Sequence, residues 1–132
     1  MQVQEGQVIL VEDGKITGIL PYEEGKISEL EVSGYEEIDL QGKYILPGLI
    51  NMHVHLAGNG KPQKKQRDNE ALVKKIMSNG LTKAIAYRMV CGFAKDELYS
   101  GVTTIRTVGG LGDFDTRLRD DIAAGKKPGP RI

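Results

Sequence analysis

Cysteine, tryptophan and long hydrophobic runs are scarce in this 132-residue sequence, which has one cysteine, no tryptophan and 5% aromatic residues. The single cysteine, Cys91, excludes an intramolecular disulfide and is typical of a reducing compartment. The longest apolar stretches are about ten residues and are interrupted by proline or glycine, too short to span a bilayer. The first residues show no basic leader followed by an apolar segment. We therefore expect a globular protein of the cytoplasm without a membrane partner.

The sequence also lacks a net charge, although its charged residues are unevenly distributed. Residues 1–60 hold ten of the eighteen acidic residues but only three of the eighteen basic ones, so the remaining part is basic. The bases of that part alternate with acids, and its one local cluster, 61–67, has no aromatic residues that could stack on bases. These features favour a solvated loop and argue against nucleic-acid binding.

Residues 1–44 have the pattern of short strands joined by tight turns. Two β-type runs, 7–11 and 15–20, flank the dipeptide Asp13-Gly14, which suits the positive φ angles of a two-residue hairpin turn. A third strand is expected at 36–40, followed by a turn at 41–43. Because a small sheet needs a partner surface to bury its apolar face, we expect this region to be marginal alone.

A second region, 45–132, alternates strands with helices. An apolar strand that ends at His55 precedes a loop and a helix capped by Asp68 or Asn69. That helix is interrupted at 79–80, and a second helical segment follows. The spacing of apolar residues along both segments predicts a buried helical face.

The second half of this region repeats the alternation. A β-branched run over 102–108 predicts a strand, and a further helix is opened by Asp113 or Asp115 and stopped by Gly125. Residues 131–132 look like the start of a third strand. Repeated strand–helix units of this length predict an α/β fold with a parallel sheet.

Periodicity also predicts which helical residues are buried. The second helical segment is expected to bury the face that carries Ile85, Met89, Phe93 and Leu98. Met77 of the preceding segment and the thiol of Cys91 are expected in the core as well.

The two histidines of the chain, His53 and His55, stand two residues apart at the end of an apolar strand. A strand directs residues i and i+2 to the same face, so both imidazoles project to one side and Val54 to the other. One interpretation is that the two histidines are simply polar residues on an exposed face of the strand. However, the strand is apolar, and the histidines stand at its carboxyl end, where ligand-binding residues of α/β folds collect. This position favours the interpretation that the two imidazoles form half of a metal site.

Five segments resemble the amidohydrolase superfamily of metal-dependent hydrolases. The strand with the histidines looks like the first barrel strand of that family, and two earlier segments resemble the small β-sandwich that precedes the barrel. Two later segments are similar to its imidazolonepropionase-like and Xaa-Pro dipeptidase-like branch. In chain order the segments are 13–16, 38–43, 47–56, 101–110 and 123–132.

The resemblance implies a fold, a cofactor and an activity. It implies the first units of a (β/α)8 barrel in 45–132, preceded by part of a β-sandwich in 1–44. His53 and His55 would bind a divalent metal, most often zinc, as one or two ions. In the family the metal acidifies a water that attacks an amide-type C–N carbonyl. A small molecule or short peptide would be the substrate, and the protein could form a homo-oligomer.

The sequence departs from the family pattern at two positions. Asn51 stands where aspartate is common, on the same strand face as the histidines. Thr107 follows Arg106 where the family usually has aspartate. Both changes remove a carboxylate near the expected site, where Asn51 and Thr107 would support the ligands or line the pocket. Gly109 and Gly110 are expected to form a tight strand-to-helix turn beside the substrate pocket.

The chain holds only the first two ligands of the implied metal site, because it has no other histidine. A complete barrel needs about 250 residues, so the chain looks truncated. We expect the intact parent protein to be an amidohydrolase and the chain alone to be inactive. The alternative is a catalytically silent fragment or an interaction piece that needs a complementary chain. No catalytic residue can be assigned within the 132 residues.

Overall fold

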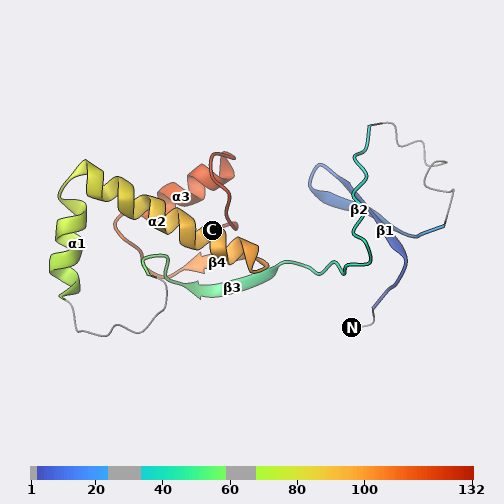
Figure 1. Cartoon of the computed structure of the whole chain (residues 1–132), viewed down its shortest axis with the longest axis horizontal. Coiled ribbons are helices and arrows are strands. Elements are labelled where there is room, and N and C mark those ends of the chain that lie inside the picture. Colours follow the sequence, from blue (N-terminus) through green and yellow to red (C-terminus); the bar gives the residue numbers. More distant parts are fainter. Residues whose placement is uncertain (1–2, 24–33, 59–67) are drawn as a thin grey trace. The chain divides into compact units, whose positions relative to one another are not determined.

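A computed structural model describes residues 3–23, 34–58 and 68–132 of the chain. These residues form two units, Met1–Tyr44 and Ile45–Ile132, and each is described by itself (Figure 1). The basic cluster at 61–67 lies outside the described residues. In the part of the chain that the structure describes, no helix is long and apolar enough to cross a membrane.

The first unit contains one antiparallel hairpin. Strand β1 (Gln7–Glu12) pairs with β2 (Lys15–Pro21), and the register shifts once between Leu10 and Val11. The turn places Asp13 at φ 48° and Gly14 at φ 72°, the positive angles that a two-residue hairpin requires. The hairpin predicted from Asp-Gly is therefore confirmed.

The strand predicted at 36–40 is wrong. This segment pairs with no strand among the described residues, and Ile38 is 71% exposed. The side chain of Asp39 accepts a hydrogen bond from the backbone N–H of Gln41 at 2.8 Å, a local arrangement that competes with strand pairing. The turn that follows is present, with Gln41 at φ 52° and Gly42 at φ 75°.

The second unit is built on two parallel strands. Strand β3 (Leu49–Val54) pairs with β4 (Val102–Thr107) in parallel. On the other edge of β4, Thr104 forms a parallel bridge with Arg131. The N–H of Arg131 donates to the carbonyl of Thr103 at 2.9 Å, and the N–H of Ile105 donates to the carbonyl of Arg131 at 2.8 Å. The strand order thus runs from β3 through β4 to the last residues of the chain.

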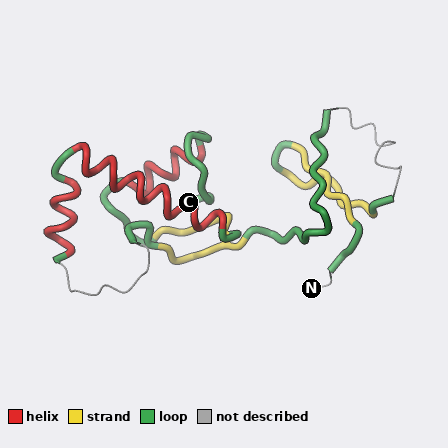
Figure 2. Tube along the Cα trace, viewed as in Figure 1, coloured by secondary structure: helices red, strands yellow, loops and turns green. Residues whose placement is uncertain are grey.

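Three helices accompany these strands: α1 (Asn69–Met77), α2 (Gly80–Tyr99) and α3 (Phe114–Ala123). The side chain of Asp68 caps α1 by accepting from the N–H of Ala71 at 3.0 Å, as predicted. Asn79 caps α2 in the same way, which explains the predicted break between the two helices. In Figures 1 and 2, α2 lies along β3 and β4, and α1 runs at a steep angle to it.

Capping of α3 by an aspartate side chain is not observed. Asp113 occupies the cap position, but its carboxylate makes no capping hydrogen bond. Its carbonyl oxygen instead accepts from the hydroxyl of Thr116 at 2.9 Å and from the N–H of Arg117 at 3.0 Å. The helix ends as predicted, with Gly125 at φ 70°.

The core lies between the strands and the helices α2 and α3. Nine of the described hydrophobic residues are buried there, and they lie in the second unit: Val54, Leu56, Ala86, Tyr87, Val90, Ala94, Ile105, Phe114 and Leu118. Leu56, Ala94 and Leu118 are at most 1% exposed. Packing of this kind is the main stabilising term of a small domain.

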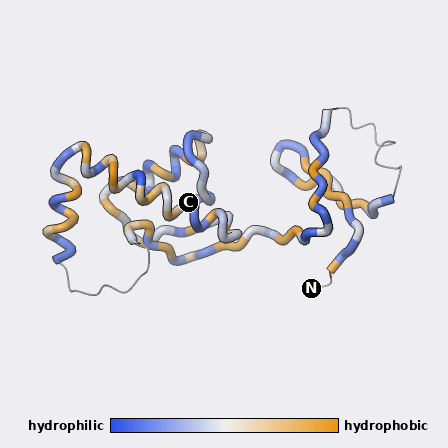
Figure 3. Tube along the Cα trace, in the orientation of Figure 1, coloured by the Kyte–Doolittle hydropathy of each residue, from blue (hydrophilic) through white to orange (hydrophobic). Residues whose placement is uncertain are grey.

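The predicted buried face of α2 is wrong for two residues. Ile85 and Met89 are 54% and 56% exposed, whereas the buried residues of α2 begin at Ala86 and Tyr87. Figure 3 shows hydrophobic and hydrophilic residues interspersed along this helix, so periodicity offers more than one apolar face. Ala86 and Ala94 of this helix are 7% and 0% exposed. Phe93, Met77 and Cys91 are partly buried and pack against the core.

Candidate metal-binding site

The two histidines lie at the carboxyl end of β3. His53 is within the strand and His55 is one residue past its end, and both are exposed in this chain. Val54 between them is 7% exposed and belongs to the core, so the imidazoles project from the opposite face. The strand itself is less buried than its sequence predicts, since Leu49 and Ile50 are each 63% exposed.

The imidazole rings converge through one nitrogen each. The Nε2 atoms of His53 and His55 are 3.2 Å apart, and the ring centroids are separated by 5.1 Å with the planes at 65°. Two neutral rings that both direct a lone pair into this gap would repel each other. One ring can donate its Nε2–H to the unprotonated Nε2 of the other, and two unprotonated Nε2 atoms at this distance suit a shared cation.

The backbone of the turn after β4 orients one of these rings. Nδ1 of His55 lies 3.3 Å from the carbonyl oxygen of Gly109, which can only accept a hydrogen bond. With its proton on Nδ1, His55 presents an unprotonated Nε2, the form that binds metals. Gly109 has φ 120°, an angle that side-chain-bearing residues rarely adopt. Glycine at this position thus directs a carbonyl toward the histidine.

Asn51 supports the strand rather than an imidazole. Its side-chain Oδ1 accepts a hydrogen bond from the backbone N–H of His53 at 3.2 Å. This contact satisfies a backbone donor at the end of β3, next to the position where the register of β3 and β4 shifts. An aspartate could accept the same bond, so the substitution changes the charge near the histidines more than the hydrogen bonding.

In the described part of the chain, Thr107 and Gly110 lie near the site but form no hydrogen bond to either histidine. Thr107 is half-buried and pairs with Val54 at the end of β4. Gly110 lies against α3, where a Cβ would collide with the carboxylate of Asp115. The Oδ1 atom of Asp115 is buried without a hydrogen-bond partner among the described residues. Gly110 therefore permits the close approach of the turn to the helix.

The histidine pair fits half of a metal-binding site. Ligand nitrogens of a tetrahedral ion, at metal–nitrogen distances of about 2.0–2.1 Å, lie about 3.3–3.4 Å from each other. The observed separation of 3.2 Å between the two Nε2 atoms is close to this value. Within residues 3–23, 34–58 and 68–132, no group of three or more His, Cys, Asp or Glu side chains could hold an ion. Further ligands would have to come from elsewhere.

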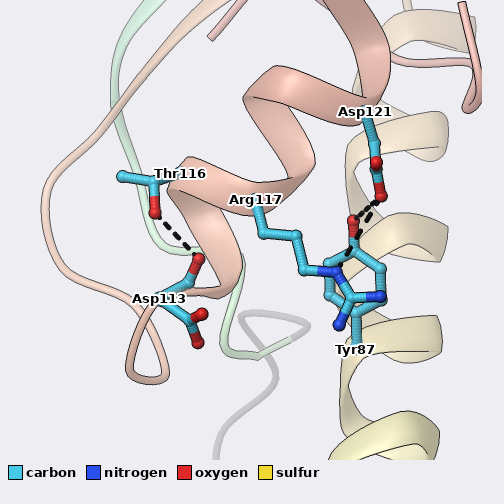
Figure 4. A network of polar contacts seen from close by, with 5 residues as sticks. All are labelled: Tyr87, Asp113, Thr116, Arg117 and Asp121. Atoms are coloured by element: carbon cyan, nitrogen blue, oxygen red, sulfur yellow. Dashed lines mark hydrogen bonds and ion pairs between the residues drawn. The ribbon is translucent and has the colours of Figure 1, made fainter. Parts of the chain in front are cut away.

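A second polar cluster, which we call the Tyr87 cluster, was not predicted from the sequence. The hydroxyl of Tyr87 on α2 donates to Oδ2 of Asp121 on α3 at 2.6 Å, and Arg117 stacks on the tyrosine ring (Figure 4). Burial and the hydrogen bond to Asp121 raise the pKa of Tyr87 well above its usual range. Because Tyr87 and Asp121 are 34 residues apart, no local pattern reveals the contact.

Comparison with known proteins gives several relatives, although no family model matches the chain. A dihydroorotase from Carboxydothermus hydrogenoformans is 40% identical over 70 residues, 49% of this chain and 16% of the relative. An imidazolonepropionase from Salmonella paratyphi A is 31% identical over 122 residues, 82% of this chain and 29% of the relative. The chain thus spans less than a third of the length of these curated relatives.

Two solved structures also resemble the chain. The structure of a candidate prolidase from Bifidobacterium longum matches with a TM-score of 0.62 and 33% identity, covering 96% of this chain and 24% of the other. The structure of molinate hydrolase matches with a TM-score of 0.65 and 30% identity, covering 96% and 25%. Nearly the whole chain therefore corresponds to about a quarter of each structure.

Proposed function

We propose that the whole protein hydrolyses amide-type C–N bonds, because this chain is a segment of a protein of the amidohydrolase superfamily. The relatives described above are hydrolytic enzymes of the same superfamily. The observation that carries the proposal is the convergence of Nε2 of His53 and Nε2 of His55 to 3.2 Å at the carboxyl end of β3. The end of a parallel strand is where α/β enzymes place their catalytic groups. A (β/α)8 barrel with a preceding β-sandwich is the fold proposed for the whole protein.

His53 and His55 would hold a divalent ion, with zinc as the proposed metal and one or two ions per site. When bound, such an ion supplies Lewis acidity and makes a water more acidic. The chain contributes the orientation of the ligands. The carbonyl of Gly109 selects the tautomer of His55, and the Asn51 side chain fixes the backbone at His53.

The proposed substrate is a small molecule or a short peptide, and the proposed location of the protein is the cytoplasm. No nucleic acid or membrane takes part in this proposal, and assembly into a homo-oligomer is compatible with it. The remaining metal ligands and the group that moves the proton would lie outside the 132 residues. For that reason the chain alone is proposed to be inactive.

A comparison of His53→Ala with Met52→Ala in the whole protein tests the proposal. Met52 is an exposed neighbour of His53, with 55% of its surface accessible. Met52→Ala therefore controls for the effect of placing an alanine on this strand. The measurements are metal content by elemental analysis and hydrolysis of cyclic amides and dipeptides. We expect His53→Ala to lose metal and activity together and Met52→Ala to keep both. A whole protein that is fully active without metal would refute the proposal.

A further inference from the structure

A groove on the helical side of the second unit is lined by none of the candidate metal-site residues. It encloses a volume of about 440 Å³ between α2 and α3, within the range of small-molecule pockets. Three cationic side chains line it: Arg88 from α2, Arg117 from α3 and Lys127 from the segment after α3. Among the described residues that line it, Asp121 is the one carboxylate. The groove therefore carries a local excess of two positive charges.

One of these cations is held in place by a buried ring. The Cζ atom of Arg117 lies 4.0 Å from the centroid of the Tyr87 ring, and Tyr87 is only 7% exposed. Figure 4 shows the Arg117 side chain lying over the ring of Tyr87, an arrangement that favours one orientation of the guanidinium group. A ligand that binds Arg117 would lose little side-chain entropy in the process, because the arginine is already oriented.

The carboxylate of the groove is already engaged. Oδ2 of Asp121 accepts the short hydrogen bond from Tyr87, whereas Nε of Arg117 is 4.0 Å away, too far for a direct hydrogen bond. Among the described residues, the guanidinium of Arg117 makes no hydrogen bond, and Arg88 and Lys127 form no ion pair. The groove thus offers cationic donors whose hydrogen-bonding capacity is unused.

We propose that this groove binds the phosphate group of a small phosphorylated molecule. A phosphate monoester carries a charge of about −1.5 to −2 at neutral pH, which matches the excess of two positive charges. The planar fork of an arginine can contact two phosphate oxygens at once, and a lysine adds a point charge. Ala84 and Cys91 also line the groove and give the rest of the ligand an apolar surface.

The test is a titration of the 132-residue chain with phenyl phosphate and with inorganic phosphate, at constant ionic strength and with a chelator that removes metal. Arg117→Gln should weaken binding by about tenfold. Asp121→Asn should strengthen it several-fold, because it removes the negative charge that the described lining carries and keeps a partner for Tyr87. Arg119→Gln, a matched change on the same helix, should leave binding within about twofold of the unchanged chain.

The gain of affinity in Asp121→Asn is decisive, since a misfolded variant cannot produce it. Tighter binding of phenyl phosphate than of inorganic phosphate identifies an ester as the ligand, and equal binding identifies the free ion. Equal affinity in all three variants, or no saturable binding, overturns the proposal. None of these results depends on metal or on hydrolysis, so they test the groove independently of the proposed function.

Discussion

The two units of the chain differ in what holds them together. Among the described residues of Met1–Tyr44 none is buried, and the hairpin leaves Ile16 and Ile19 at 64% and 51% exposure. The described part of the unit Ile45–Ile132 contains nine buried hydrophobic residues. The turn at Asp13-Gly14 and the pairing of β1 with β2 set the backbone of the first unit, whereas packing stabilises the second. The histidine pair stands in the unit that has a core.

The largest effect is expected when this core is damaged. Leu118→Ala should lower the free energy of unfolding by about 2–5 kcal/mol, because it removes a fully buried side chain and leaves a cavity. Ile19→Ala in the hairpin should cost less than about 1 kcal/mol, since the side chain is already half exposed. Urea unfolding of both variants, followed by circular dichroism of the helices, measures the difference. Equal losses would show that the two units share one cooperative core.

An intermediate effect is expected at the turn that orients His55. Gly109→Ala forces a side chain onto φ 120° and should displace the carbonyl that binds Nδ1 of His55, weakening zinc binding by about tenfold. Gly101→Ala is the matched control, because Gly101 also has a positive φ, 93°, but lies at the other end of β4. Competition with a coloured chelator gives both affinities. The same loss in the control would mean that backbone strain, rather than the carbonyl, is responsible.

A smaller effect is expected from the Tyr87 cluster, and it depends on pH. The pKa of Tyr87 is raised by folding, so the folded state keeps the proton more tightly than the unfolded state. Its contribution is fully present below the unfolded pKa of about 10 and is lost as the pH rises beyond it. Tyr87→Phe should cost about 1 kcal/mol at pH 7 and flatten the loss of stability above pH 10. An unchanged alkaline profile in the variant would contradict this assignment.

The smallest effect on the second unit is expected from the hairpin turn. Gly14→Ala places a side chain at φ 72°, which should destabilise the hairpin by about 1 kcal/mol. Amide exchange should therefore quicken in β1 and β2 while the amides of α2 and β4 keep their rates. A matching increase in both sets of amides would show that the units do not unfold separately.

Local chemistry explains which parts of this fold are predictable from the sequence. Asp13-Gly14 predicts its hairpin and Asp68 caps its helix, because each effect acts within a few residues. The segment 36–40 fails as a strand because pairing requires a partner, which its own pattern cannot supply. The buried face of α2 is ambiguous for a similar reason, since the strands and α3 select Ala86 over Ile85.

The candidate site shows the same limit. The i, i+2 spacing predicts that His53 and His55 share a face, and the structure places their Nε2 atoms together. The carbonyl that orients His55 belongs to Gly109, 54 residues further along, and only the parallel pairing of β3 and β4 brings it there. Tyr87 and Asp121 likewise meet only through the packing of α2 on α3. Contacts made by tertiary packing have no local pattern to reveal them.

His53 and His55 are proposed to be joint ligands of one ion, and zinc titration followed by nitrogen-15 NMR of the histidine rings tests this role most directly. The two Nε2 signals should shift together and saturate at one ion per chain, with weak affinity because only two ligands are present. Either His53→Ala or His55→Ala should abolish the shift of the remaining ring. Zinc binding that persists unchanged in both variants, or shifts at Nδ1 of His55 instead, would contradict joint binding of one ion by the two Nε2 atoms.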